Sequence, residues 1–139
     1  MDPETKRKTL EKMRSDPYSE MLGMELLDIE PGYSRVSMVI RDDMFNFNDL
    51  PHGGAIFSLA DVAFAAASNS HGIVSVALNM EISYLRSVPS GTRLLAEATE
   101  EHLGRRTALY HITVKSEEGD LIASCHGVVY RKKAKLLES

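Results

Sequence analysis

The feature that most constrains this chain is one stretch from Gly53 to Ser70, with the sequence GGAIFSLADVAFAAASNS. It holds no proline, is rich in alanine, and is apolar on nearly every face until Ser68. These properties predict a helix that is roughly 25 Å long at 1.5 Å per residue. A helix that is apolar all round is a buried helix. The rest of the chain must therefore form a layer that covers it.

The segments on either side of this helix are predicted to be strands. They cover 21–29 and 34–40 before the helix, and 74–88, 93–102, 107–116 and 121–130 after it. Turn-forming residues such as Glu30-Pro31-Gly32 separate them. Polar and apolar residues alternate in 107–116, as is typical of an antiparallel strand with one buried face. One helix and one sheet predict an α+β fold in which a curved antiparallel sheet wraps around the long central helix.

The chain is predicted to hold one domain, because 139 residues with 43% apolar content suffice for a single core. We expect residues 1–20 to form a charged helix over 4–15 and a lead-in, with Pro17 ending the helix, 21–131 to form the domain, and 132–139 to be a solvated tail. A small curved sheet leaves one face and both edges open. A second copy of the chain is the expected cover, in a dimer or in a dimer of dimers, which is a homotetramer.

The composition argues against several function classes. The net charge of -4 is unlike that of a general nucleic-acid binder, which normally has a basic surface. No apolar run reaches the ~20 residues of a membrane span, and the start lacks the apolar run of a signal peptide. The single cysteine, Cys125, cannot form an internal disulfide. We therefore expect a cytoplasmic protein with neither nucleic acid nor a membrane as its partner.

Two other kinds of site are not expected. The histidines show no spacing typical of metal ligands, such as a pair four residues apart on a helix. Cys125 and His126 are neighbours on a predicted strand, so their side chains point to opposite faces of the sheet. They therefore cannot act together as a nucleophile and its base.

Asp61 is the one charged residue of the predicted buried helix, and burying an unpaired carboxylate is costly. Two structural explanations are open: Asp61 accepts hydrogen bonds from a nearby donor, or it lies on a wet stripe with Ser58 and Ser68. The functional explanation is a general base or nucleophile in a partly dry cleft, where burial raises its basicity. A lone acidic residue in a helix is more often structural than catalytic.

The residues before the helix favour the functional explanation. His52-Gly53-Gly54 lies where the backbone N–H groups of the helix have no partner. Two glycines let a ligand approach the main chain closely, and the positive end of the helix dipole favours an oxyanion there. A plain turn into the helix, with His52 in its first turn, is the structural alternative.

The spacing of Asn46, the His52-Gly53-Gly54 segment and Asp61, followed by Ala63-Phe64-Ala65 and Asn69-Ser70, resembles one family. This is the family of hotdog-fold acyl-CoA thioesterases of the phenylacetic acid degradation type, also called PaaI-like. The later segment Met80-Glu-Ile-Ser-Tyr84-Leu85-Arg86 and Gly91 resembles the central strand of that family. The resemblance extends from Leu22 to Tyr130.

The resemblance implies a hotdog fold and hydrolysis of an aromatic or fatty acyl-CoA to the free acid and coenzyme A, with no cofactor beyond the coenzyme A of the substrate. Asp61 would activate water or attack the thioester carbonyl, acting across a subunit boundary. The N–H of Gly53 would bind the thioester oxygen, His52 and Gly54 would shape that end of the site, and Asn46 would position the water or the thioester.

One position departs from the family pattern. Some relatives carry a hydroxyl residue on the strand after the helix to hold the water, and the aligned residue here is Ala77. Ser75 and Asn79 lie two residues to either side and are expected to share its face, so both are open as substitutes.

The resemblance also implies sites for the two ends of the substrate. Arg86, Arg105 and Arg106 are predicted to bind the phosphates of coenzyme A, since guanidinium groups pair well with phosphate oxygens. Phe45, Phe47, Leu50 and Phe57 are candidates for the acyl pocket, although aromatic residues at such places are just as often core.

Two alternative functions are open from the sequence. A hydratase acting on an unsaturated acyl-CoA would use an aspartate and a histidine together, and Asp49 with His52 is an imperfect fit for that pair. A non-catalytic acyl-CoA binding module would keep the cleft and the arginines but would not need Asp61.

Overall fold

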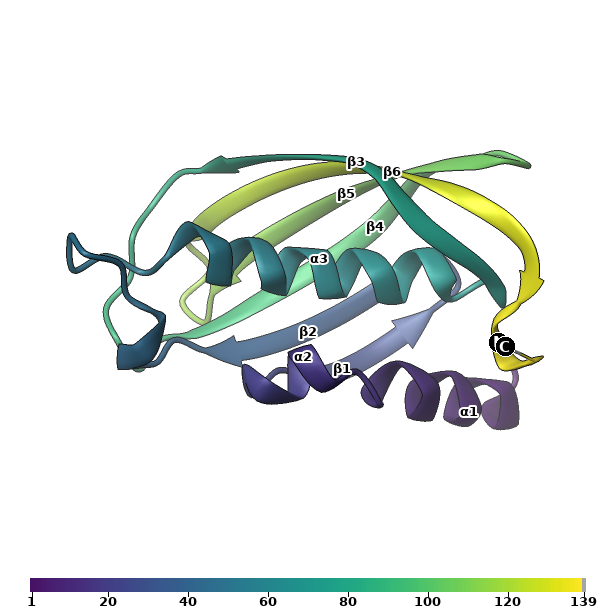
Figure 1. Ribbon diagram of the computed structural model, residues 1–139, viewed down its shortest axis with the longest axis horizontal. Helices are drawn as coiled ribbons and strands as arrows, with labels where there is room; N and C mark the ends of the chain where they lie inside the picture. Colours follow the sequence, from purple (N-terminus) through teal and green to yellow (C-terminus); the bar gives the residue numbers. More distant parts are fainter. Residues whose placement is uncertain (139) are drawn as a thin grey trace.

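A computed structural model describes residues 1–138, which form one antiparallel sheet curved around one long helix (Figure 1). The helices are α1 (Pro3–Arg14), α2 (Pro17–Met21) and α3 (Gly53–Asn69), with short 3-10 turns η1 (Asp42–Met44) and η2 (Leu136–Glu138). The strands are β1 (Glu25–Glu30), β2 (Tyr33–Val39), β3 (Ile73–Tyr84), β4 (Arg93–Leu103), β5 (Thr107–Ser116) and β6 (Leu121–Lys135). The predicted α+β class, with a sheet wrapped around a central helix, is confirmed.

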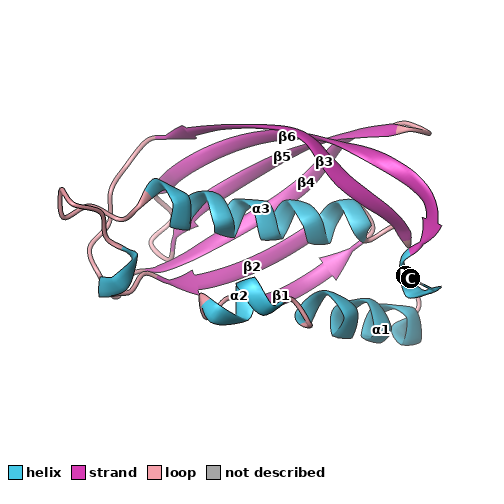
Figure 2. Ribbon diagram, in the orientation of Figure 1, coloured by secondary structure: helices cyan, strands magenta, loops and turns pink. Residues whose placement is uncertain are grey.

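The six strands lie in the order β1-β2-β4-β5-β6-β3, so β1 and β3 form the two edges. All three α-helices lie on the same side of the sheet, with α3 in its concave face (Figure 2). Alternate residues of the central strands point towards α3. Tyr110, Ile112 and Val114 of β5 are fully buried in this way, as their alternation predicted.

Close packing fixes α3 on the sheet near its middle. A Cβ atom on Gly127 of β6 would lie 2.6 Å from Cζ of Phe64 on α3. The Phe64 ring fills that space and meets Tyr110 of β5 edge to face, with ring centroids 5.8 Å apart. The missing side chain at Gly127 therefore sets how closely the helix approaches the sheet.

The N-terminal segment differs from the prediction in one respect. Helix α1 ends at Arg14, and Pro17 does not merely stop it but is the first residue of a second short helix, α2. Proline is well tolerated at the first position of a helix because its missing N–H would have no partner there. Strand β1 consequently starts at Glu25 rather than at Met21.

The C-terminal segment also differs from the prediction. Strand β6 continues to Lys135, where it pairs with Ile73 of β3, and the following Leu136 is buried. Residues 132–135 are exposed but ordered in the sheet, so the prediction of a solvated tail is wrong for 132–136. Ser139 lies outside the described residues.

Within residues 1–138, no helix is long and apolar enough to span a membrane. The same residues contain no group of three or more His, Cys, Asp or Glu side chains that could hold a metal ion. Cys125 is buried and its neighbour His126 is exposed, which confirms that the two side chains point to opposite faces of β6.

Candidate functional site

Asp61 lies in the middle of α3, half-buried at the wall of a cavity. Its carboxylate makes no hydrogen bond or ion pair with any of residues 1–138, so the explanation of a carboxylate held by a structural donor is not met. Burial raises the pKa of Asp61 above its ordinary value, and the nearby charge of Asp16 raises it further. A carboxylate that is partly dry and unpaired has the basicity that a general base or nucleophile needs.

At the start of α3, all but one of the backbone N–H groups of the first turn have an acceptor. The N–H of Gly54 donates to Nδ1 of His52 at 2.9 Å. Those of Ala55 and Ile56 donate to the carbonyl oxygen of His52 at 3.0 and 3.4 Å. Among residues 1–138, no acceptor is within reach of the N–H of Gly53. The structure therefore leaves one donor at the positive end of the α3 dipole, the one that the resemblance assigned to the thioester oxygen.

His52 is the N-terminal cap of α3. Because its Nδ1 accepts the N–H of Gly54, the neutral ring carries its proton on Nε2. No carboxylate within residues 1–138 contacts the ring. Asp49, in the loop before it, has a positive φ of 56° and makes no bond to His52. The aspartate and histidine pair of a hydratase is therefore not formed in this chain.

Tyr84, at the end of β3, is a site residue that the sequence did not indicate. Its hydroxyl donates to the carbonyl oxygen of Gly53 at 3.0 Å. Its ring covers the Gly53 backbone so closely that a Cβ there would lie 3.2 Å from Cζ of the ring. Glycine at position 53 thus lets Tyr84 pack on the helix start and hold it. Only the fold brings together two residues so distant in sequence.

Asn46 lies in the loop before α3, and its side chain stabilises that loop by hydrogen bonds. Its side-chain oxygen accepts the N–H groups of Asn48 at 2.9 Å and Leu50 at 3.2 Å. Its side-chain NH₂ group has no acceptor among residues 1–138, and the loop projects past the start of α3 (Figure 1). This NH₂ group is the part of Asn46 that remains available for a substrate or for a water molecule.

The free N–H of Gly53 and the carboxylate of Asp61 belong to the same helix but are two turns apart. Eight residues at 1.5 Å each place them about 12 Å from one another along the axis. A thioester carbonyl is only a few ångströms across. One chain therefore cannot apply both groups to the same carbonyl.

An irregularity in β3 changes which of its predicted site residues lie on the same face of the sheet. Ala77 pairs with Val129 while Asn79 pairs with Val128, so the register shifts between them and Leu78 is the extra residue. A bulge of this kind reverses the alternation of side chains. Val129 is buried beneath α3, and Ala77 opposite it shares that face, but Asn79 points to the outer face. The expectation that Asn79 shares the face of Ala77 is wrong.

Ser75 lies on the same face as Ala77, but its polar groups already form hydrogen bonds within the fold. It is buried, its N–H donates to Oδ1 of Asn69 at 2.9 Å, and its hydroxyl donates to the carbonyl of Ile73 at 3.3 Å. The Asn69 side chain in turn donates to the carbonyl of Ser75 at 3.2 Å. This exchange ties the end of α3 to the start of β3, so Ser75 serves the fold.

The three predicted phosphate-binding arginines lie at two ends of the sheet. Nη1 of Arg86 is 3.2 Å from Oδ1 of Asp120, which lies just before β6. Arg105 and Arg106 lie in the turn between β4 and β5, at the other end of β5. That strand has ten residues and is about 33 Å long. All three are exposed, and one chain does not gather them around one ligand.

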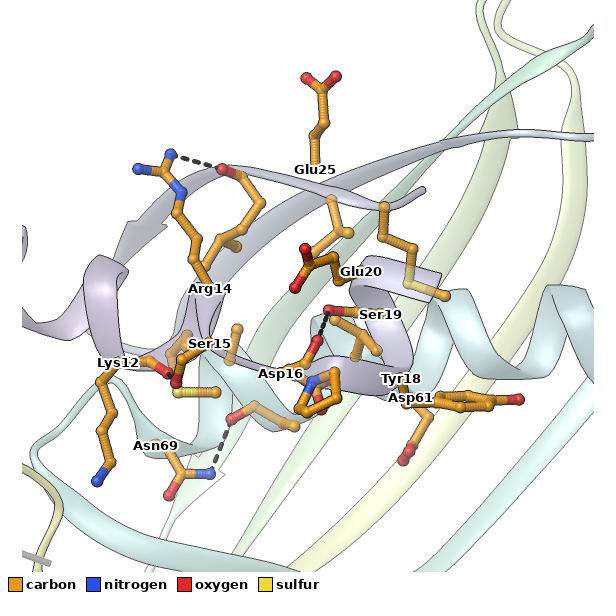
Figure 3. Close-up of a pocket in the computed structure, with 18 of the residues that line it drawn as sticks. Lys12, Arg14, Ser15, Asp16, Tyr18, Ser19, Glu20, Glu25, Asp61 and Asn69 are labelled. Atoms are coloured by element: carbon orange, nitrogen blue, oxygen red, sulfur yellow. Dashed lines mark hydrogen bonds between the residues drawn. The ribbon is translucent and has the colours of Figure 1, made fainter. Parts of the chain in front are cut away.

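The cavity beside Asp61 has a volume of about 880 Å³. It lies between α3 and the N-terminal segment 12–20, with β1 behind it, and Figure 3 shows Asp16, Tyr18 and Asp61 among the residues around it. None of the predicted acyl-pocket residues lines it. Phe47, for example, is 99% exposed at the loop tip. Phe45 instead lines a second hollow of about 490 Å³, together with Asp42 and Val88. The cavity beside Asp61 is formed by a segment that the sequence did not implicate.

Comparisons with known proteins agree with this fold. The model of the thioesterase superfamily matches residues 50–123. The chain is 34% identical to acyl-coenzyme A thioesterase PaaI of Escherichia coli over 117 residues, which cover 84% of each chain. The solved structure of the E. coli PaaI protein matches with a TM-score of 0.88 at 30% identity, over 94% of this chain and 98% of that one.

Two further solved structures are similar. The TT0310 protein from Thermus thermophilus matches with a TM-score of 0.81 at 43% identity, over 84% of this chain and 98% of that one. The protein smu.793 from Streptococcus mutans, bound to acetyl CoA, matches with a TM-score of 0.77 at 28% identity, over 81% and 90%. This chain therefore belongs to the thioesterase superfamily, as a PaaI-like hydrolase with the hotdog fold.

Proposed function

We propose that this protein hydrolyses acyl-CoA thioesters, with Asp61 as the base or nucleophile and the N–H of Gly53 as the oxyanion donor. The observation that carries the proposal is the unpaired, half-buried Asp61 at the wall of a cavity large enough for an acyl group. The similarity to an acyl-coenzyme A thioesterase, and to a protein bound to acetyl CoA, supports coenzyme A as the thiol.

The proposed reaction uses a carboxylate and one donor. As a base, Asp61 takes a proton from water while the water oxygen attacks the thioester carbon. The carbonyl oxygen becomes an oxyanion beside the Gly53 N–H, where the helix dipole stabilises it. The C–S bond then breaks, and the proton on Asp61 passes to the coenzyme A thiolate. As a nucleophile, Asp61 attacks the carbon itself, and water hydrolyses the resulting anhydride. Both routes need Asp61 ionised, and neither needs a cofactor beyond the coenzyme A of the substrate.

We propose further that the site forms between two copies of the chain. Gly53 and Asp61 of one chain are about 12 Å apart along the helix, so the Gly53 of one copy must act with the Asp61 of another. The free edge of β3 supports this pairing, because Leu78 is 61% exposed there and Tyr84 is 50% exposed. The fully exposed Phe47 at the loop tip is a second surface that a partner would cover. A dimer or a dimer of dimers satisfies these requirements.

A two-fold axis at the β3 edge, perpendicular to that strand, also affects where the two ends of the substrate lie. It would run the two α3 helices in opposite directions and bring the Arg86 end of one sheet beside the Arg105 end of the other. We propose that coenzyme A phosphates bind there, with Arg86 and Arg105 contributed by different copies. The single buried cysteine, Cys125, is consistent with the reducing cytoplasm that we propose as the location.

The central test is steady-state hydrolysis of a panel of acyl-CoAs by the wild type and by Asp61→Asn. Loss of a positioned base typically costs about 10²- to 10⁴-fold in rate, and we expect a fall of that order in kcat. Glu118→Gln, the same chemical change on an exposed turn, is the matched control and should keep wild-type activity. Equal turnover by wild type and Asp61→Asn would refute the assignment. Binding of acyl-CoA without hydrolysis by either protein would favour a binding module.

A mixing experiment tests the shared site. The Asp61→Asn protein still has an intact Gly53, and a Gly53→Pro protein still has an intact Asp61. If the site is shared, mixed oligomers of the two inactive proteins regain up to about half of the sites of a wild-type dimer. If each chain holds its own site, mixing restores nothing. Light scattering on the wild type gives the size of the assembly.

A further inference from the structure

The cavity beside Asp61 is larger than hydrolysis of a small thioester requires. Its 880 Å³ falls in the range of roughly 300–1,000 Å³ that holds drug-sized ligands. An acetyl group would leave most of this space unfilled. In the proposed reaction the thioester carbonyl lies at Asp61, so the cavity beside it has room for an acyl group larger than acetyl.

The lining next to Asp61 is apolar. On α3, the residues that follow it along the cavity are Val62, Ala65 and Ala66, and the opposite walls add Met13, Leu26 and Val36. Ala65, which is partly exposed, keeps the helix side of the cavity open, because a larger side chain there would project into it. An apolar acyl chain would bury its surface against this lining.

The outer wall of the cavity, formed by the N-terminal segment 12–20, is fixed by hydrogen bonds at two points. Nη2 of Arg14 donates to the carbonyl oxygen of Leu26 at 2.8 Å, which ties the end of α1 to β1. The hydroxyl of Tyr18 on α2 is 3.0 Å from Oγ of Ser58 on α3. The segment between these two anchors, 15–17, bridges the cavity. Its shape is therefore set before any ligand enters.

Asp16 gives this wall a negative charge near the catalytic carboxylate. Asp16 is the N-terminal cap residue of α2, yet its side chain makes no capping hydrogen bond. Its charge is close enough to raise the pKa of Asp61. Asp16 and Asp61 line the same cavity, and both are labelled in Figure 3. A carboxylate at the end of a short acyl chain bound in this cavity would be repelled by the charge of Asp16.

We propose that this cavity is the acyl site, that it accepts apolar acyl groups larger than acetyl, and that Asp16 rejects short acyl groups ending in a carboxylate. The inference rests on the proposed thioesterase function and names its substrate class. The N-terminal segment 12–20 thereby becomes the part of the chain that determines specificity, while α3 carries the chemistry.

The size limit is tested with Ala65→Leu, which fills the cavity one turn from Asp61. We expect kcat/KM for octanoyl-CoA relative to acetyl-CoA to fall about tenfold or more, since overfilling a packed apolar site is costly. Ala134→Leu makes the same change on an exposed part of β6 and should leave this ratio as in the wild type. An unchanged ratio in folded Ala65→Leu would overturn the acyl site.

The charge limit is tested independently with Asp16→Asn, which keeps the shape of the wall. Succinyl-CoA and butyryl-CoA have acyl chains of the same length, and only the first ends in a carboxylate. We expect the ratio of kcat/KM for succinyl-CoA to that for butyryl-CoA to rise about tenfold or more in Asp16→Asn, because like charges placed together are strongly disfavoured. Glu118→Gln is the control. A ratio that does not change would overturn the role of Asp16.

Failure of the acyl site and failure of the proposed function give different results. If the wild type hydrolyses no acyl-CoA, or if Asp61→Asn is as active as the wild type, the proposed function is wrong. The acyl site is then judged by calorimetric dissociation constants for the same substrate pairs. Selective weakening of octanoyl-CoA binding in Ala65→Leu supports the site, and equal weakening of both ligands, or of neither, overturns it.

Discussion

The oxyanion donor can be removed without breaking the helix that carries it, by replacing Gly53 with proline. Gly53 is the first residue of α3, a position where proline is well tolerated. Its N–H has no acceptor among residues 1–138, so the substitution breaks no bond of the fold. His52 has φ of -63° and ψ of 130°, which is the conformation that a residue before proline prefers. Gly53→Pro therefore removes one hydrogen-bond donor without breaking a hydrogen bond of the fold.

The second effect of the substitution is steric and needs its own control. Any Cβ at position 53 would lie 3.2 Å from Cζ and 3.3 Å from the hydroxyl oxygen of Tyr84. Tyr84 is 50% exposed and has room to move by the few tenths of an ångström required. Gly53→Ala adds the same Cβ but keeps the N–H. The ratio of the two variants therefore isolates the donor.

We expect kcat of Gly53→Pro to lie about 10²- to 10³-fold below that of Gly53→Ala, which is the usual effect of losing one oxyanion donor, about 2.7–4 kcal/mol. Both variants should unfold at similar temperatures, because each restricts the unfolded chain and neither loses a backbone hydrogen bond. Steady-state kinetics with one acyl-CoA and thermal unfolding at one protein concentration provide the comparison. Equal kcat values for two folded variants would refute the assignment of Gly53 as the donor.

Four other outcomes follow from the structure. Gly127→Ala should destabilise the protein by about 1–3 kcal/mol in urea unfolding, because the new Cβ would lie 2.6 Å from the Phe64 ring, and a second change, Phe64→Leu, should recover part of that loss. In a plot of kcat/KM against pH, the midpoint of the acid limb should lie above the ordinary pKa of an aspartate, since activity needs ionised Asp61 and burial raises its pKa. Asp16→Asn should move this midpoint to lower pH, because it removes a nearby negative charge. Because the folded-state pKa of Asp61 lies above the unfolded one, its ionisation costs stability as pH rises through that interval, so Asp61→Asn should unfold at a higher temperature than the wild type at pH 7. Burial raises the pKa of Cys125 to about 11, so iodoacetamide should label it slowly in the native protein and fast in urea, and fast native labelling would contradict its burial.

The long helix and most strands were predictable because their signals are local. A run of alanines and other apolar residues without proline determines α3, and alternation determines β5. Asp61 and Gly53 could be identified for the same reason, as an unusual charge and a glycine at a helix start. The resemblance to a family then gave both residues a role.

What could not be predicted depends on contacts between distant segments or on backbone irregularity. The bulge at Leu78 cannot be recognised from the pattern of polar and apolar residues, yet it moves Asn79 to the other face of the sheet. Tyr84 reaches Gly53 only because β3 returns beside the start of α3. A proline such as Pro17 can end one helix or start the next. Only the packing of α2 on α3 decides between these two structures.

The position of Asp61 along α3 explains why one helix can serve two sites. The helix dipole favours an oxyanion only at the N-terminus, within the first turn. A base must be kept partly dry to be strong, and the middle of α3, between the sheet and the N-terminal segment, provides that environment. The two requirements cannot be met at one point of one helix. Two helices running in opposite directions meet both requirements twice, so the proposed dimer gains two complete sites from a single pair of residues, Gly53 and Asp61.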